Sequence, residues 1–465
     1  MLTVNHPLTR RRILSVGALS LGGWALGEFR LRQALAQASP SNSPLATGKS
    51  VIVLFQQGGP SQHETTDPKP DAPDGIRTVT GVTQTRLPGV LFGDTLPRLA
   101  ERADKFTVVR SFTTGNAGHN IQPFVGPATQ NAYLGAVYSS VVGATHPVTA
   151  MPTNAVLFPQ AVDDTVAKGQ GRGDFAATGP FGAAFAPFFP GGPGQLLRNL
   201  RLSLDPDRFL DRRKLLSEFD RLKGDAEFHA GMDGYDREQQ QALEVLLSGS
   251  VANALDLSRE DPAILARYDT SRFAAKHHWA KANRGKRGYY TGHAKTLGKA
   301  LLLARRLCEA GCGFVTVHTG YEGVWDMHAD GNNLDMRDGM QAVGPAFDHA
   351  IAAFIDDCES RGLSDRILLV ATGEMGRTPK LNKRGGRDHW AKLAPLIAYG
   401  GGAGRGQVVG QSQRDGGEAS SNPVTSENLI ATLLHTVFDL GQVRLRPEFT
   451  AVARLGEAAP IPGLI

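Results

Sequence analysis

Short uninterrupted apolar runs recur along the chain, and glycine or polar residues follow each of them. The clearest lie at residues 50–55, 106–110, 313–318 and 367–371, and a fifth lies at 394–399. Apolar runs of this length without polar alternation are typical of strands buried on both faces, as in a parallel sheet. We therefore expect these segments to be strands of one sheet.

Other segments repeat their apolar residues at the spacing of an amphipathic helix. The predicted helices span residues 209–223, 237–247, 293–310, 338–360 and 427–440. Gly311 and Gly362 follow two of these segments and are expected to end the helices. Ser426 is expected to cap the last helix.

The alternation of strands and helices predicts an α/β fold with a doubly wound, mostly parallel sheet. The length fits a single large domain over residues 50–465 that carries loop and helix insertions. Residues 129–290 open with a stretch rich in glycine, proline and alanine that has few long apolar periods. We expect this region to be an insertion that shapes the rim of a site.

The first 38 residues have the pattern of a twin-arginine (Tat) export signal. Arg10 and Arg11 precede an apolar segment at residues 16–26, and Ala36-Gln-Ala38 follows it. The apolar segment is too short and too rich in glycine to span a bilayer, so we expect no stable membrane insertion. We expect export to the periplasm or the extracellular space, with residues 39–49 as a linker. A basic amphipathic helix is the alternative.

Composition argues against two other classes of protein. The formal net charge is +5, but the first 38 residues hold five arginines and one glutamate, and without them the charge is +1. The charge therefore gives no reason to expect a nucleic-acid partner, and the basic, aromatic residues 276–290 are better explained as a solvated loop. Cys308, Cys312 and Cys358 contain no Cys-x-x-Cys pair, so we expect buried thiols rather than a zinc ribbon or a disulfide framework.

Chemically active side chains gather after the run at residues 367–371. Glu374 stands where that strand should end, and ligands in open α/β sheets bind beyond the carboxyl ends of the strands. A basic loop with Arg377 and Arg387 follows, and then Asp388 and His389. Carboxylates, cations and an imidazole suit a metal site that faces an anionic substrate. A solvated basic loop with a structural histidine is the alternative.

The same residue types follow the earlier predicted strands. His63 and Asp67 come after the first strand, His119 after the second, and Asp326 and His328 after the third. The Asp-x-His spacing puts a carboxylate and an imidazole on one side of an extended segment, as in many metal sites. Each histidine alone could be structural, and Asp326 could be a helix cap. Their recurrence at several strand ends favours a metal site.

Six motifs occur in a fixed order along the chain after the export signal. They are Gly58-Gly-Pro-Ser61, Asp67-Pro-Lys-Pro70, Leu303-Ala-Arg-Arg-Leu307, Trp325-Asp-x-His328, Gly373-Glu-x-Gly-Arg-Thr-Pro379 and Gly386-Arg-Asp-His-Trp390. In this order they resemble the domain of unknown function 1501 family, which comprises Tat-exported, sulfatase-like proteins assigned to the alkaline phosphatase superfamily.

That resemblance implies a doubly wound sheet with two metal ions near the carboxyl ends of the strands, acting on phosphate or sulfate esters. By motif, Asp326 and His328 look like one pair of ligands, Glu374 like the strand-end carboxylate and His389 like a late ligand. The resemblance adds no candidate site residues to those already named.

The chain departs from the superfamily pattern in two places. Gln56-Gln57 ends the first strand where a metal-binding aspartate is usual, and the Cys/Ser-x-Pro-x-Arg motif of formylglycine sulfatases does not occur. His119 lies roughly where the nucleophile is expected. The hydroxyl-bearing residues nearby are Ser111, Thr113 and Thr114. The identity of the nucleophile stays open.

The sequence favours an exported, metal-dependent hydrolase-like protein whose substrate is an anionic phosphate or sulfate ester. We expect one or two divalent ions, with Zn or Mn favoured by the mixed nitrogen and oxygen ligands. Arg377 or Arg387 is expected to neutralise developing charge, with His119 at the reacting centre. The alternative is a non-catalytic metal- or anion-binding protein that retains the fold. The substrate and the oligomeric state stay open.

Overall fold

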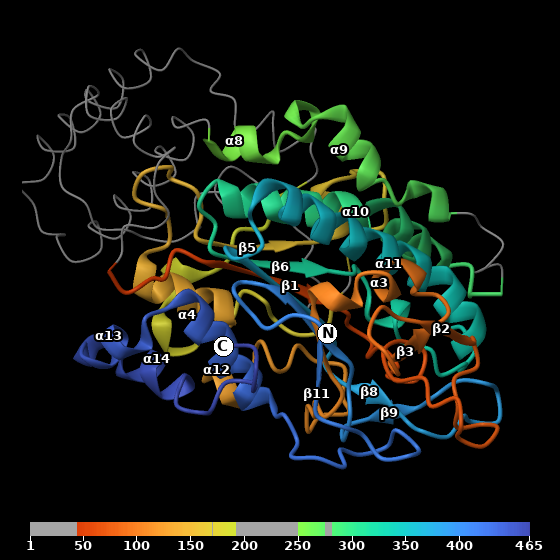
Figure 1. Cartoon of the computed structure of the whole chain (residues 1–465). Coiled ribbons are helices and arrows are strands. Elements are labelled where there is room, and N and C mark those ends of the chain that lie inside the picture. Colours follow the sequence, from red (N-terminus) through yellow and green to blue (C-terminus); the bar gives the residue numbers. More distant parts are fainter. Residues whose placement is uncertain (1–43, 170, 192–249, 275–280) are drawn as a thin grey trace, which may run out of the picture.

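A seven-stranded sheet with helices on both faces forms the centre of the computed structural model (Figure 1). The structure describes residues 44–169, 171–191, 250–274 and 281–465. The predicted export signal, the first part of the linker and the predicted helices at 209–223 and 237–247 lie outside the described residues.

The central sheet has the strand order β11-β4-β10-β7-β1-β6-β5. Its strands are β1 Ser50–Phe55, β4 Thr107–Val109, β5 Asn154–Leu157, β6 Phe314–His318, β7 Ile367–Thr372, β10 Leu396–Gly400 and β11 Gln407–Val409. The pairs β1–β6, β1–β7, β5–β6 and β4–β11 are parallel, whereas β10 is antiparallel to both β4 and β7. The expected mostly parallel sheet is confirmed, with β10 as the reversed strand.

Two short strand pairs lie outside this sheet. One pairs β2 Val82–Gln84 with β3 Leu91–Gly93, and the other pairs β8 Gly376–Arg377 with β9 His389–Trp390. The second pair matters for function because it follows β7 and brings the two ends of the basic loop together.

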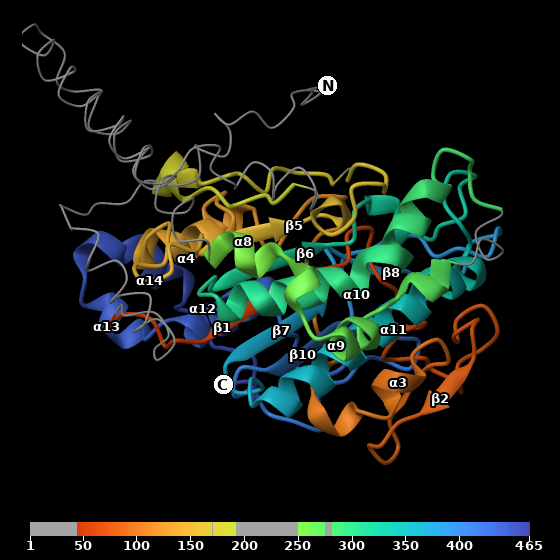
Figure 2. The ribbon, with the colours of Figure 1, turned by 90° about the horizontal axis from the view of Figure 1, so that it is seen from above.

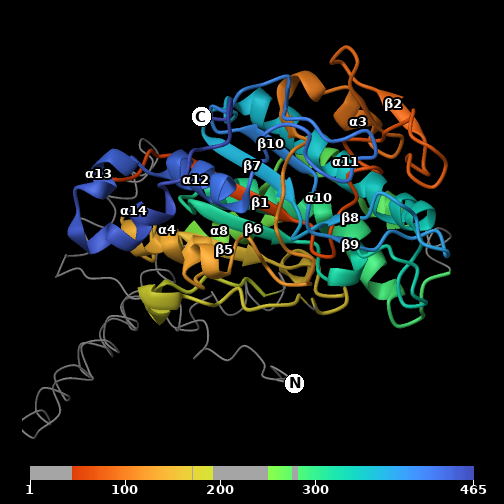
Figure 3. The same ribbon diagram turned by 90° about the horizontal axis from the view of Figure 1, so that it is seen from below.

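The described α-helices cover the two faces of the sheet. They are α3 Pro97–Ala100, α4 Leu134–Val142, α8 Ser250–Leu255, α9 Pro262–Arg267, α10 Arg287–Glu309, α11 Met336–Arg361, α12 Ser426–Val437, α13 Leu440–Arg444 and α14 Thr450–Leu455. Figure 2 shows α10 and α11 across one face, and Figure 3 shows α4 and α12 toward the opposite face. This two-sided cover is the doubly wound arrangement predicted from the sequence.

Strand β1 shows why the central strands are apolar throughout. Ile52 and Leu54 belong to the core cluster on the side of α10 and α11, while Val53 and Phe55 belong to the cluster on the side of α4 and α12. A strand covered on both faces has no solvent side, so it needs no polar alternation. The burial of the whole of β7 agrees with this account.

The helix ends follow capping chemistry, with one correction. Asp335 caps α11 by accepting a hydrogen bond from the Asp338 N–H, and Gly362 ends the helix in the left-handed conformation. The predicted cap Ser426 is wrong, because Ser426 is already the first helical residue of α12. Thr425 is the cap, and its side chain and that of Asn428 bond each other's backbone in a capping box.

The expectation that residues 129–290 form only an insertion and rim is wrong for their first part. Strand β5 pairs in parallel with β6 at the edge of the central sheet, and α4 packs in the core on one face. The four-residue β5 and the almost wholly buried α4 carry no clear apolar period. Such short elements are hard to distinguish from the glycine- and proline-rich background.

The expectation about the cysteines can be compared with the structure directly. Cys308, Cys312 and Cys358 are free and buried, which confirms the predicted thiols. Within the described ranges, no helix is both long and apolar enough to cross a bilayer.

Candidate metal centre

The fold brings several strand-end loops to one edge of the sheet. Because β1, β4, β6 and β7 run in the same direction, the loops that follow them lie at the same edge. His119 comes from the loop after β4 and Asp326 from the loop after β6. Glu374 follows β7, and His389 lies on β9. Residues far apart in the sequence therefore meet here.

The carboxylate of Asp326 is the centre of the site. Its Oδ2 atom lies 3.2 Å from His119 Nε2 and 2.9 Å from His328 Nε2, and its Oδ1 atom lies 3.2 Å from His389 Nε2. In the described part of the chain, ligand atoms of His119, Asp326 and His389 all lie within 4.8 Å of one another. The structure thus brings a carboxylate and two imidazoles into one group, with a third imidazole beside it.

Two of the histidines are oriented through their other ring nitrogen. His389 Nδ1 lies 3.0 Å from the carbonyl oxygen of Ala117, which can only accept, so this nitrogen carries the proton. His119 Nδ1 lies 3.1 Å from Glu374 Oε1 and donates in the same way. Each Nε2 atom then faces Asp326, and its lone pair becomes available to an ion once Nε2 is deprotonated. Histidines that bind metals are usually held by such a partner on the second nitrogen.

The separations between the ligand atoms fit one shared ion. On a tetrahedral centre with bonds of about 2.1 Å, neighbouring ligand atoms lie about 3.4 Å apart. His119 Nε2 and His389 Nε2 are each 3.2 Å from an oxygen of Asp326. One carboxylate with imidazoles is a mixed oxygen and nitrogen set, which suits Zn²⁺ or Mn²⁺. The residues present therefore fit a divalent ion.

Electrostatics at the cluster depend on which groups are charged. Burial alone would raise the pKa of Asp326, but hydrogen bonds from His119, His328 and His389 outweigh burial and hold this pKa well below its ordinary value. Burial lowers the pKa of His119, yet its hydrogen bonds with Asp326 and Glu374 outweigh burial and raise the pKa to about 9. A bound ion would have to displace the proton from His119 Nε2.

Glu374 lies behind His119 and not within the shared group of ligands. Its side chain is fully buried, and both carboxylate oxygens accept from the backbone N–H of Gly58 at 2.9 and 3.1 Å. Burial raises the pKa of Glu374 from its ordinary value, and the bonds from His119 and Gly58 counteract part of that rise. The sequence suggested Glu374 as a ligand; its position fits a role in orienting His119.

Arg377 does not face a substrate as the sequence suggested. Its guanidinium is fully buried and donates to Asp326 Oδ1 at 2.7 Å and to the carbonyl oxygen of Gly59 at 2.8 Å. It also bonds the carbonyl oxygens of Gly58, Trp325 and Arg387. Arg377 therefore stabilises Asp326 and the turn after β1.

Arg387 is also turned inward, and the expectation that it neutralises substrate charge needs correction. It is fully buried and forms an ion pair with the equally buried Glu64 at 3.0 Å. Its remaining N–H groups donate to backbone carbonyl oxygens. Asp388 is exposed, and its Oδ1 accepts from Asn382 Nδ2 at 3.0 Å, so its side chain is not among the ligand group either.

His63 and Asp67 are not brought to this group. His63 is buried, its Nε2 donates to the carbonyl oxygen of Asp415 at 2.7 Å, and burial lowers its pKa to about 4. Asp67 forms an ion pair with Lys69 at 3.1 Å. Both residues follow β1 as Asp326 follows β6, but the turn after β1 directs them to a different part of the molecule.

The hydroxyl-bearing residues after β4 are already engaged or enclosed. Thr113 Oγ1 donates to the carbonyl oxygen of Ala391, and Thr114 Oγ1 donates to that of Asn116, each at 3.1 Å. Ser111 is fully buried, and a side chain added at Gly410 would collide with its hydroxyl. These positions do not mark any of the three as a nucleophile.

Asn333 is a site residue that sequence reasoning missed. Its Nδ2 donates to Asp326 Oδ2 at 3.0 Å and lies 3.4 Å from His328 Nε2. The local signal was a turn: Asp330 Oδ1 accepts from the backbone N–H groups of Asn332 and Asn333. An Asx turn directly after Asp-x-His returns the chain toward the ligands.

A family model described as a protein of unknown function (DUF1501) matches residues 48–444, which include every residue of the cluster. The chain belongs to the DUF1501 family. A search among curated proteins gave no match.

Solved structures similar to this DUF1501 protein include a sulfatase, a hydrolase and a phosphatase. PsFucS1 sulfatase from Pseudoalteromonas sp. is 13% identical with a TM-score of 0.32, over 92% of this chain and 71% of the sulfatase. The phosphonate monoester hydrolase SpPMH from Silicibacter pomeroyi is 13% identical with a TM-score of 0.27, over 83% and 72%. Alkaline phosphatase from the Antarctic bacterium TAB5 is 15% identical with a TM-score of 0.25, over 80% and 94%. A proposal of activity has to rest on the side chains of this chain.

The motifs of this DUF1501 protein divide between the site and its support. Asp326 and His389 are in the cluster, whereas Glu64 and Arg387 form a buried ion pair. The two arginines of the Leu-Ala-Arg-Arg-Leu motif lie on α10 and pair with Glu260. A motif residue is therefore not by itself a site residue.

Proposed function

We propose that this DUF1501 protein is an exported, metal-dependent hydrolase that acts on a phosphate or sulfate ester. The observation that carries the proposal is the convergence of His119, Asp326 and His389, with both imidazoles held through Nδ1. A histidine with a purely structural role does not need to be oriented in this way toward a buried carboxylate.

The chemistry divides between an ion and the residues of this chain. A divalent ion bound here would polarise an ester oxygen and lower the pKa of water. His119, Asp326 and His389 would hold the ion, and Glu374 and Arg377 would keep His119 and Asp326 in place. His328 is partly exposed, so its Nε2 could give a proton to a leaving group or take one from water.

The anionic part of a substrate needs a cation other than the two buried arginines. Lys380, Lys383 and Arg384 on the same loop are exposed. Arg384 is the best placed, because its Nη1 lies 3.5 Å from the carbonyl oxygen of Ala329, next to His328 in the sequence. We expect Arg384 to contribute to binding the ester and not to holding the ion.

A second candidate function is a non-catalytic protein that binds a metal ion or an anion. The engaged hydroxyls of Thr113 and Thr114 favour it, because they leave no side chain marked as a nucleophile. Gln57 supports it too: its side chain bonds His318, Asn120 and Arg172, and so it is occupied in holding loops together. In this case the ion would be bound without turnover.

Metal content and turnover, measured together, test the proposal. Purified mature protein is loaded with Zn²⁺, Mn²⁺ or Mg²⁺ and assayed on aryl phosphates, phosphodiesters and aryl sulfates. His389→Ala should lose most of the metal and all turnover, since one ligand of a small set is removed. His328→Ala should lose turnover. His435→Ala, which changes a half-buried histidine of α12 outside the cluster, is the control and should retain both.

Three outcomes separate the possibilities. Metal at equal, near-zero levels in wild type and His389→Ala would contradict the metal site. Metal that depends on His389, without hydrolysis of any ester, would leave the non-catalytic alternative. Turnover that survives in Ser111→Ala, Thr113→Ala and Thr114→Ala supports direct attack by water over an enzyme ester.

Export is proposed from Arg10 and Arg11 together with the apolar segment at residues 16–26 and Ala36-Gln-Ala38. Replacing both arginines by lysine should retain precursor inside the cell, because the twin-arginine route reads this pair. Fractionation of cells that express the wild type or the double variant measures how much precursor stays inside. Equal export of the two proteins would contradict the proposal.

A further inference from the structure

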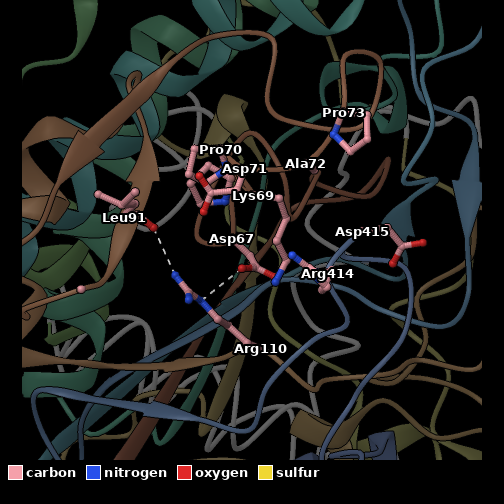
Figure 4. Close-up of a pocket in the computed structure, with 12 residues that line it drawn as sticks. Asp67, Lys69, Pro70, Asp71, Ala72, Pro73, Leu91, Arg110, Arg414 and Asp415 are labelled. Carbon is pink, nitrogen blue, oxygen red and sulfur yellow. Dashed lines mark hydrogen bonds and ion pairs between the residues drawn. The ribbon is translucent and has the colours of Figure 1, made fainter.

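Figure 4 shows a polar cavity with a volume of about 630 Å³. Its walls are the loop 67–73, Gly89, Leu91 of β3, Arg110 after β4, and residues 414–415 after β11. None of these residues belongs to the cluster of His119, Asp326 and His389. The cavity is thus a separate place at which a ligand could bind.

The floor of the cavity is a carboxylate whose oxygens are already engaged. Asp67 is buried, and its Oδ2 lies 3.1 Å from Lys69 Nζ and accepts from the Ser412 hydroxyl. Its Oδ1 lies 3.6 Å from Arg110 Nε. Two cations therefore face one carboxylate, and the floor has an excess of positive charge.

The cations around Asp67 have hydrogen-bond donors to spare. Lys69 carries three N–H donors and has one ion-pair partner, Asp67, in the described part of the chain. Arg110 uses Nε and Nη2 on the carbonyl oxygens of Thr66 and Leu91, which leaves its Nη1 without an acceptor among the described residues. Arg414 is exposed and has no hydrogen bond or ion pair within those residues.

Two further carboxylates, Asp71 and Asp415, also line the cavity. Asp71 is exposed, and Asp415 Oδ1 accepts from the backbone N–H of Gly417 at 2.9 Å. Together with Asp67 they match the three cations Lys69, Arg110 and Arg414, so the lining has no net formal charge. A bound anion should be held weakly and lost as salt rises. The unpaired hydrogen-bonding groups at the floor are nevertheless all donors, so a ligand has to supply acceptors.

We propose that this cavity binds a tetrahedral oxyanion, sulfate or phosphate, either as a free ion or as a group on a larger molecule. Figure 4 shows Lys69, Arg110 and Arg414 around Asp67. The three cations come from three separate segments, so their donors approach a ligand from several directions. An oxyanion with three or four acceptor oxygens can use all of them, whereas a planar carboxylate offers two oxygens. The proposal does not depend on the metal centre.

Calorimetric titration of metal-stripped protein with sulfate and phosphate, at constant ionic strength, tests this. Arg414→Ala should weaken binding by about tenfold, since it removes a charge-assisted hydrogen bond. The control is Arg446→Ala, an exposed arginine without a side-chain partner in the described residues and far along the chain from the cavity. It should bind both anions like the wild type.

A second variant and a second set of ligands complete the test. Lys69→Met should weaken binding as well, and its thermal unfolding shows whether the fold is kept. Phenyl sulfate and phenyl phosphate distinguish a group on a larger molecule from a free ion, because only the former source predicts binding of these esters. Absent binding, or binding that is lost in His389→Ala and unchanged in Arg414→Ala, would overturn the cavity as the site.

Discussion

Asp326 shows at the scale of one residue why the site is tightly specified. The carboxylate is buried, so every hydrogen bond that it accepts offsets the cost of removing its charge from water. The side chains that donate to it are His119, His328, Asn333, Arg377 and His389. Arg377 is the permanently charged donor among them and stabilises the charged carboxylate without an ion.

Replacing Glu374 tests whether it orients His119 or binds the ion itself. Glu374→Gln keeps the size of the side chain but removes the charge that holds His119 Nδ1. We expect metal affinity to fall about 10- to 100-fold, as is typical when an outer partner of a ligand is changed, with the number of bound ions unchanged. Competition with a chelator measures the affinity. A loss as complete as that in Asp326→Ala would show that Glu374 is a direct ligand.

Gly58 is a second residue that supports the site, through its backbone. Its φ is +116°, and a side chain there would collide with the carbonyl oxygen of Glu322 and lie 2.8 Å from the N atom of Asp326. We expect Gly58→Ala to destabilise the protein by at least about 2 kcal/mol more than Gly75→Ala, because overpacking adds to backbone strain.

Gly75 is a suitable control for that measurement. Its φ is +82°, and nothing lies within 4 Å of a side chain built there. Gly75→Ala therefore carries the backbone strain alone. Denaturant unfolding of the two metal-stripped variants gives the difference, and equal stabilities would mean that the turn after β1 can move away from the Asp326 segment.

The hairpin of β8 and β9 is the element that joins the basic loop to the site. Arg377 and His389 are directly paired across it, and both reach Asp326 Oδ1. Residues directly opposite each other in a hairpin have neighbouring side chains. The pairing of the two strands therefore places both side chains that contact Asp326 Oδ1 side by side.

Helices α10 and α11 and the residues on either side of α9 are joined by a network of charges. Arg305 of α10 lies 2.7 Å from Glu260 and 3.1 Å from Asp357 of α11, and Arg361 lies 2.8 Å from Asp357. Asp357 is fully buried and also accepts from the Tyr268 hydroxyl at 3.0 Å. The network explains a motif of the sequence as support for helix packing and not as part of a site.

Removing Arg305 should therefore destabilise the protein without altering the metal centre. Arg305→Met leaves the buried Asp357 with fewer partners, and we expect a loss of roughly 3 kcal/mol. Lys299→Ala on the same helix removes a cation that forms no side-chain hydrogen bond or close ion pair in the described residues and should change stability by less than about 0.5 kcal/mol. Denaturant unfolding and metal content measure both effects. A loss of metal in folded Arg305→Met would contradict this separation.

At the scale of the whole molecule, buried histidines make stability depend on pH. Burial lowers the pKa of His63 and His293 to about 4 and that of His318 to about 3. The unfolded chain takes up these protons near pH 6.5, while the folded chain stays neutral until a lower pH. The contribution of these three histidines to stability should therefore be full above about pH 6.5 and fall as the pH drops toward 4, by up to about 1.4 kcal/mol per pH unit for each group.

Unfolding of metal-stripped protein between pH 4.5 and 7.5 measures this dependence. His293→Leu should reduce the slope below pH 6.5 by up to about 1.4 kcal/mol per pH unit, since it removes one buried histidine with a lowered pKa. His293 is a suitable choice because its only hydrogen bond in the described residues joins Nε2 to the carbonyl oxygen of Val343 at 3.4 Å. A stability that rises on acidification would contradict the expected sign.

The sequence by itself determined the strands and the region of the site. The apolar runs at β1, β6 and β7 are local signals, because a strand buried on both faces must be apolar at every position. Parallel strands place the loops that follow them at one edge of the sheet. The sequence therefore predicts that Asp326 and His389 lie close together.

Only the tertiary structure decided which side chains face the centre. His63 and His119 both follow strands, and Arg377, Arg387 and Arg384 share one loop, yet their surroundings differ. The direction of a side chain depends on partners far along the chain, as in the Glu64–Arg387 pair, whose members are 323 residues apart. No local pattern encodes such a contact, because a buried cation and a solvated one look alike in sequence until the acceptor is known.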